Sequence, residues 1–239
     1  MGKAEPPAVQ IALAGALIAT AGDVSLLVAG SGHIAVPSAA FSPVVFFGTL
    51  LGVAGIPLYQ LGYWHEASLA SNRAPKLAFW LRLGGTLFSG TGAAVHAATG
   101  LSIAAAAGSA PPPNPYEAIL QGGPTFLGLW ALAAAAFFLA TIPHLMCCHG
   151  GKDRLANPLV VTVLILGLSL LLPSAVGNVL GPASVNIAHI VFFWPRRASA
   201  TRSAPANTEH VKPANLPRPR VNSTNQRKLQ TGADAREGQ

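Results

Sequence analysis

Charged side chains are scarce in this chain of 239 residues. Asp, Glu, Lys and Arg make up 10% of it, whereas hydrophobic residues make up 51%. Ordinary soluble domains carry about 25% charged residues. The sequence also contains several apolar runs of roughly 20 residues, the length that a helix needs to cross the hydrocarbon core of a bilayer. The scarcity of charge excludes an ordinary soluble core and indicates a polytopic membrane protein.

Cysteine is almost absent as well. The only two, Cys147 and Cys148, are adjacent, and disulfide geometry requires separations and directions that sequence neighbours do not offer. We therefore expect no structural disulfide. The first apolar run, from about Ala8 to Ala29, is longer than the ~7–15 residue core of a signal peptide and is followed by no clear cleavage site. It is expected to be an uncleaved span.

Sequence motifs of common soluble enzymes and nucleotide-binding proteins are also missing. The chain has no Gly-rich phosphate loop, Ser-His-Asp signature, HExxH sequence or nucleotide-binding motif. Its net charge of +7 is concentrated in the tail, because nine of the 15 Lys and Arg residues follow Pro195. This placement indicates a basic tail rather than a nucleic-acid-binding fold, so no nucleic acid partner is expected.

Six apolar segments are predicted to form transmembrane helices. They cover about residues 8–29, 43–64, 77–107, 125–146, 158–172 and 178–194, and the last two are short for a full crossing. If the spans alternate, every Lys and Arg falls on the side that holds both termini, which the positive-inside rule assigns to the cytoplasm. We predict an all-α, multi-pass helix bundle in the cell membrane, with the lipid bilayer as its main partner.

The polar composition of residues 195–239 differs from that of the spans. This stretch is nearly devoid of large apolar residues, so it is expected to be a disordered cytoplasmic tail. Its basic residues offer a contact for anionic lipid.

Small residues and one histidine recur at helical spacing within the third segment. They are Gly85, Ser89, Gly92, His96 and Gly100. Because small residues let another helix approach closely, His96 is expected to point into the bundle. Asp23 shares a face of the first segment with Ala12, Ala16 and Ala19.

Asp23 and His96 form the candidate catalytic pair. At ~1.5 Å per residue both lie in the outer half of the bilayer, so their side chains can meet. A carboxylate on one imidazole nitrogen raises the basicity of the other nitrogen, as a general base, a proton relay or a metal ligand requires. The alternative is a structural pair that holds two helices in register.

The last segment adds polar residues on one face, and they are expected to line the bundle interior. These are Asn178, Asn186 and His189, together with Pro182. By depth, Asn186 is better placed than His189 to approach the Asp23–His96 pair, and a zinc ion shared by the two histidines would be strained. Hydrogen bonding between helices is the alternative role.

The second segment contains a GxxxG arrangement, Gly48 and Gly52, and a proline, Pro57, where a kink is expected. Tyr59, Tyr63 and Trp64 are predicted to form an aromatic belt near its end. Residues 65–76, including Glu66, are expected to form a polar loop. At the end of the fourth segment, His144, Cys147, Cys148 and His149 form one compact Cys/His group, which lacks the second pair of ligands typical of zinc sites.

The combination of Gly22-Asp23, Gly48 to Gly52, Ile56 to His65 and His96-Ala97 resembles a family of small multi-pass bacterial membrane proteins known only as a domain of unknown function. The resemblance covers about residues 8–194 and implies Gly22, Asp23, Trp64, His65 and His96 as family-type positions. A looser similarity is to ceramidase-like membrane hydrolases, which bind zinc through intramembrane histidines and an acidic residue. This chain departs from them in having six predicted spans rather than seven and Asn186-x-x-His189 in place of two histidines.

Three functions therefore remain open. The first is a non-catalytic or small-solute membrane protein with a buried Asp/His core. The second is a membrane-embedded lipid hydrolase that uses Asp23 and His96, with zinc as its possible cofactor. The third is a proton-coupled carrier that uses the same pair, against which the absence of a detectable internal repeat counts.

Overall fold

The computed structural model describes residues 7–30, 41–106, 123–148 and 151–202, with side chains as far as Arg196 in the last stretch. These residues form helices and turns and contain no strand, which confirms the all-α class. The elements are α1 (Ala8–Gly30), α2 (Phe41–Gly55), the 3₁₀ turn η1 (Ile56–Leu58), α3 (Tyr59–Ala70), α4 (Pro75–Ala106), α6 (Gly123–Cys147), α7 (Gly151–Leu155), α8 (Pro158–Ser169) and α9 (Ser174–Arg202).

Four helical segments of the described chain are long and apolar enough to cross a membrane. They are Ala8–Gly30, Ser42–Ala70, Gly123–Cys147 and Ser174–Arg196. Helix α4, although it has 32 residues, is not among them, because its many small and hydroxyl-bearing residues lower its mean hydropathy. Helix α8 has 12 residues, a length of about 18 Å, and is therefore shorter than the ~30 Å hydrocarbon core.

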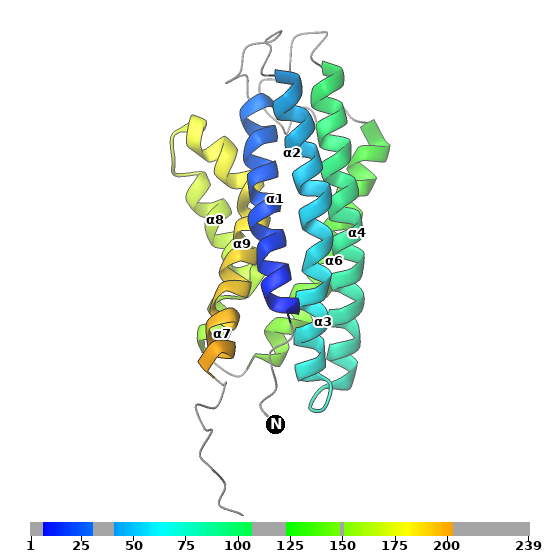
Figure 1. Cartoon of the computed structure of the whole chain (residues 1–239), viewed down its shortest axis with the longest axis vertical. Coiled ribbons are helices and arrows are strands. Elements are labelled where there is room, and N and C mark those ends of the chain that lie inside the picture. Colours follow the sequence, from blue (N-terminus) through cyan, green and yellow to red (C-terminus); the bar gives the residue numbers. More distant parts are fainter. Residues whose placement is uncertain (1–6, 31–40, 107–122, 149–150, 203–239) are drawn as a thin grey trace, which may run out of the picture. The chain divides into compact units, whose positions relative to one another are not determined.

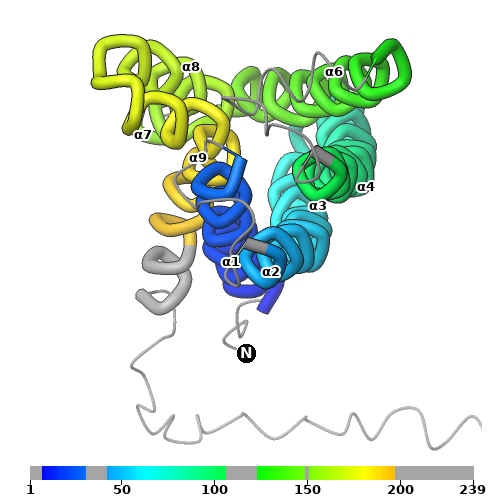
Figure 2. Tube along the Cα trace, turned by 90° about the horizontal axis from the view of Figure 1, so that it is seen from above, coloured from blue at the N-terminus to red at the C-terminus, as the bar shows by residue number. Residues whose placement is uncertain are grey.

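The long helices lie side by side within the compact unit that ends at Ala204 (Figure 1). Viewed end on, α1 lies between α9 and α2 (Figure 2). Helix α4 contacts α2, α3 and α6, and α8 packs mainly on α9. The predicted tail lies almost entirely outside the described residues, except that α9 continues to Arg202, beyond the predicted end at 194.

Pro57 interrupts the second segment as expected. Proline lacks the N–H that an α-helix requires, and the chain forms the turn η1 there before α3 begins. The predicted polar loop at 65–76 is wrong, because α3 continues to Ala70 and only residues 71–74 connect it to α4. No proline or glycine lies between Tyr63 and Ala70, so nothing in the backbone ends the helix earlier.

The predicted aromatic belt is also wrong for two of its three members. Tyr59 and Tyr63 are fully buried, and only Trp64 is exposed, at 42%. The rings of both tyrosines pack against His189 and Phe193 on α9. They lie in the core because their hydroxyl groups find hydrogen-bond partners on α9.

Glycines set the distance between the helices around the core. A Cβ on Gly22 of α1 would lie 2.7 Å from the Gly48 carbonyl oxygen and from the Gly52 nitrogen of α2. A Cβ on Gly100 of α4 would overlap Thr49. These contacts bear out the predicted close approach through the GxxxG arrangement and the stripe on α4. His96, on that stripe, is 6% exposed.

Candidate functional site

Asp23 and His96 meet inside the bundle, as the depth argument predicts. The Nδ1 atom of His96 lies 3.2 Å from Oδ1 of Asp23. The other ring nitrogen, Nε2, lies 3.0 Å from the carbonyl oxygen of Gly48. The side chain of Asp23 is 17% exposed and that of His96 is 6% exposed. The pair therefore joins α1, α2 and α4 in a largely buried setting.

Asn186 extends this pair to α9 and α3. Its Nδ2 atom donates to Oδ2 of Asp23 over 2.5 Å, and its Oδ1 atom accepts a hydrogen bond of 2.6 Å from the hydroxyl of Tyr59. We refer to Asp23, Tyr59, His96 and Asn186, with the Gly48 carbonyl, as the central polar cluster. The prediction that Asn186 approaches the pair is confirmed.

His189 belongs to a separate set of contacts. Its Nδ1 atom lies 2.7 Å from the carbonyl oxygen of Val185, an acceptor only, so Nδ1 carries the hydrogen. In the neutral ring, Nε2 then accepts the hydrogen bond of 2.8 Å from the Tyr63 hydroxyl. Asn178 lies about two turns before Asn186 on α9, is half-buried and makes no hydrogen bond to the central polar cluster.

The described residues do not fit a zinc site. No group of three or more His, Cys, Asp or Glu side chains within them is arranged to hold a metal ion. Both ring nitrogens of His189 already have hydrogen-bond partners. The side chain beside the Asp23–His96 pair is the amide of Asn186 rather than a third histidine or carboxylate. Zinc prefers nitrogen, thiolate and carboxylate ligands, usually four in a structural site and three in a catalytic one.

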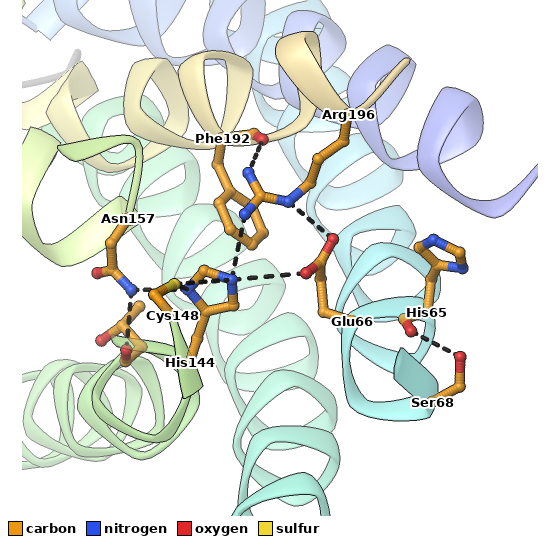
Figure 3. A network of polar contacts seen from close by, with 9 residues as sticks. His65, Glu66, Ser68, His144, Cys148, Asn157, Phe192 and Arg196 are labelled. Carbon is orange, nitrogen blue, oxygen red and sulfur yellow. Dashed lines mark hydrogen bonds and ion pairs between the residues drawn. The ribbon is translucent and has the colours of Figure 1, made fainter. Parts of the chain in front are cut away.

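A second cluster joins α3, α6 and α9 (Figure 3), near the C-terminal end of each helix. Glu66 accepts a hydrogen bond of 2.7 Å from Nε of Arg196 and lies 3.5 Å from Nε2 of His144. The guanidinium of Arg196 also lies 4.0 Å from the ring centre of Phe192. Asn157 approaches His144 from the other side, at 2.9 Å. We call Glu66, His144, Asn157 and Arg196 the end cluster.

Asn157 and Arg196 approach the two ring nitrogens of His144 from opposite sides. The Oδ1 atom of Asn157 caps α8 by accepting from the Leu159 N–H at 2.9 Å. Its Nδ2 atom therefore donates, to Nδ1 of His144 and to the Thr141 carbonyl. The other ring nitrogen, Nε2, lies between Oε2 of Glu66, at 3.5 Å, and Nη2 of Arg196, at 3.2 Å.

The predicted Cys/His group is only partly brought together. The sulfur of Cys148 lies 3.6 Å from Nδ1 of His144, whereas Cys147 is half-buried and His149 lies outside the described residues. Burial raises the pKa of the Cys148 thiol to about 11. At neutral pH the thiol is therefore protonated, which makes it a poor nucleophile and metal ligand.

An apolar groove opens on the side of the bundle between α2 and α4. Its volume is about 410 Å³, and its walls include Phe46, Leu50 and Leu101. The groove accommodates hydrocarbon, but nothing in its lining is titratable.

The family-type positions lie in different parts of the structure. Gly22 lies at the closest approach of α1 and α2. Trp64 donates a hydrogen bond of 3.0 Å to the hydroxyl of Thr86 from an exposed position. The ring of His65 points away from the end cluster (Figure 3), and its carbonyl accepts from Ser68. Neither Trp64 nor His65 reaches the central polar cluster.

Sequence reasoning missed Glu66 and Arg196 as partners. The signal for Glu66 was present, because Tyr59, Tyr63, Glu66 and Ala70 follow one another at spacings of four, three and four, which places them on one helical face. A face that continues through a charged residue indicates a buried charge that has a partner.

No protein-family model matches the chain, and no curated protein or solved structure has significant similarity to it. The resemblance to the family of unknown function therefore stays a prediction.

Proposed function

We propose that this chain is a six-span integral membrane protein of the cell membrane with both termini in the cytoplasm. The direction of its helices supports the count. Contacts between α3 and α9 follow ascending order in both helices, from Tyr59–Asn186 to Tyr63–His189 and Glu66–Arg196, so the two helices run parallel. Parallel spans are separated by an odd number of crossings. Helices α4, α6 and α8 supply three.

The end cluster supports the orientation. It brings the C-terminal ends of α3, α6 and α9 to one end of the bundle. The exposed basic residues Arg73, Lys76, Lys152 and Arg154 lie in or next to the turns that follow α3 and α6. Exposed tryptophans, Trp64, Trp80 and Trp194, occur near the same helix ends. An excess of Lys and Arg marks the cytoplasmic side, and tryptophan is enriched at the membrane surface.

The protein works without catalysis, as a small-solute membrane protein whose central polar cluster holds the helices together. One observation carries this proposal: every ring nitrogen, carboxylate oxygen and amide group of His96, Asp23 and Asn186 already has a partner within the protein. A general base needs a free lone pair within reach of its substrate or water. His96 has none, which counts against the lipid hydrolase.

A proton-coupled carrier is the second candidate function. The observation that favours it is the partial exposure of the Asp23 side chain, 17%, beside a histidine that is nearly inaccessible. Carboxylate–histidine pairs inside membranes are typical of proton relays in pumps and transporters.

Two experiments test these proposals. The first is topology mapping in a cysteine-free chain. An impermeant maleimide should label Asn114→Cys in intact cells, but label Ser71→Cys and Gly151→Cys only after permeabilisation. Labelling of Ser71→Cys in intact cells would contradict the orientation.

The second experiment tests for catalysis. Purified protein is incubated with lipid esters and amides beside His96→Gln, a variant of similar size that has no imidazole. We expect the same background turnover for both proteins. Hydrolysis by the wild type that His96→Gln lacks would overturn the non-catalytic proposal.

A further inference from the structure

We propose that Asp23 and His96 form an intramembrane proton-binding site that holds one proton between them. This inference rests on the proposed membrane-spanning arrangement, and it deepens the proposed function by naming the ligand of the central polar cluster. It follows from which atoms face each other.

Both ring nitrogens of His96 face oxygen atoms that accept hydrogen bonds. Nε2 lies 3.0 Å from the Gly48 carbonyl oxygen, which has no hydrogen to give, so Nε2 carries one. Nδ1 lies 3.2 Å from Oδ1 of Asp23. A bare nitrogen and a carboxylate oxygen at this distance would repel each other through their lone pairs. A second hydrogen therefore lies between Nδ1 and Oδ1.

That hydrogen can be bonded to Nδ1 of His96 or to Oδ1 of Asp23, and the pair holds the same number of protons in both cases. The pair is either an imidazolium beside a carboxylate or a neutral imidazole beside a carboxylic acid, and each holds one proton more than an imidazole beside a carboxylate. The other carboxylate oxygen, Oδ2, accepts from Asn186, whose amide is oriented by the Tyr59 hydroxyl. The additional proton is thereby confined to the Oδ1–Nδ1 contact.

Charge balance favours the one-proton state. Helix α1 contributes Asp23 alone as a titratable group, α2 contributes only the Gly48 carbonyl, and α4 contributes His96. The groups that face the pair from α9 and α3 are Asn186 and the fully buried Tyr59. The pair is neutral overall with one proton. Removal of that proton leaves an uncompensated negative charge, which is costly to bury.

The position of the pair indicates the side from which protons reach it. Asp23 is seven residues from the end of α1 at Gly30, or about 10 Å, but fifteen residues from Ala8, or about 22 Å. Its side chain is the more exposed of the two. Protons therefore exchange through the end of the bundle opposite the end cluster.

The test measures both partners in purified, reconstituted protein at neutral pH. Nitrogen-15 NMR of labelled histidine distinguishes imidazolium from neutral imidazole, and infrared spectroscopy distinguishes carboxylic acid from carboxylate. Signals are assigned by their loss in His96→Gln and Asp23→Asn. In water at pH 7, free aspartate and most free imidazole are unprotonated, so a bound proton is readily distinguished.

We expect the wild type to show either the imidazolium of His96 or the carboxylic acid of Asp23. In Asp23→Asn the imidazole should be neutral, because an amide can donate to Nδ1. His189 is the control, since its partners, the Val185 carbonyl and the Tyr63 hydroxyl, are the same in both proteins and include no carboxylate. A wild-type spectrum that combines neutral His96 with ionised Asp23 would overturn the proposal.

The wild-type spectra decide the question even if a variant fails to fold, because sequential assignment of uniformly carbon-13 and nitrogen-15 labelled protein then identifies the signals of Asp23 and His96. The readout depends on neither transport nor topology. A failure of the proton site is therefore distinguishable from a failure of the proposed six-span function, which maleimide labelling tests.

Discussion

Gly52 is the position where one added methyl group should disrupt the central polar cluster. A Cβ at Gly52 would overlap Nε2, Cδ2 and Cε1 of the His96 ring. The ring cannot turn aside and keep its partners, because Asp23 and the Gly48 carbonyl engage its two nitrogens from opposite sides. Gly52→Ala should therefore break both contacts of His96.

The cost follows from two contributions. Forcing an extra carbon into a well-packed core costs about 1–3 kcal/mol. Hydrogen bonds between helices in membrane proteins average about 0.6 kcal/mol and reach about 1.7 kcal/mol. One overlap and two lost contacts together predict that Gly52→Ala lowers the free energy of unfolding by about 2–6 kcal/mol.

Gly90→Ala is the matched control. Gly90 lies within α4, and a Cβ there would have no atom within 4 Å. Alanine is favoured over glycine in a helix by about 1 kcal/mol, so this variant should be as stable as the wild type or slightly more stable. Thermal unfolding in one detergent, followed by circular dichroism, measures both variants. Equal stability of the two, with His96 still bonded to Asp23 by NMR, would refute the reasoning.

Three further predictions concern the end cluster and Cys148, which lies beside His144. Arg196→Met should lower the free energy of unfolding by about 3–5 kcal/mol, because it removes the guanidinium that pairs with buried Glu66 and leaves only His144 beside the carboxylate. Thermal unfolding should show Glu66→Gln/Arg196→Met to be more stable than Arg196→Met alone. Asn157→Asp should retain the α8 cap but lose both side-chain donors, so its melting temperature should fall between those of wild type and Asn157→Ala. Burial raises the thiol pKa of Cys148 to about 11, so iodoacetamide should alkylate it slowly at neutral pH and faster as the pH approaches that value. Mass spectrometry of a chain without Cys147 measures the alkylation rate, and a rate at neutral pH equal to that of Ser71→Cys would contradict the prediction.

The central polar cluster was largely predictable, because both the face of a helix on which a residue lies and its depth in the membrane follow from residue spacing in the sequence. The spacing of Gly85, Ser89 and His96 defines one face of a helix, and counting residues from the charged ends gives their depth. The same count brought Asp23 and Asn186 to the level of His96. The contact itself depends on glycines of α2, whose role is visible only when the helices are packed.

The end cluster was not predicted, because hydropathy alone defined the spans. Glu66 lowers the local hydropathy, so the second segment was predicted to end at residue 64, two residues before it. Its partner, Arg196, is 130 residues away in the sequence, and a local window cannot detect such a partner. Tyr59 and Tyr63 were assigned to the surface for a related reason, since tyrosine at a span end usually lies at the membrane surface.

The two clusters are parts of one ladder between α3 and α9. Tyr59 bonds Asn186, Tyr63 bonds His189 and Glu66 pairs with Arg196, each one step nearer the end cluster. A buried polar group without a partner is costly in an apolar surrounding. Rotating α9 by one residue would break all three contacts together, so the ladder sets the register of α9 against α3. That register is what brings the amide of Asn186 to the carboxylate of Asp23, so the end cluster helps to position the proton-binding pair although it does not touch it.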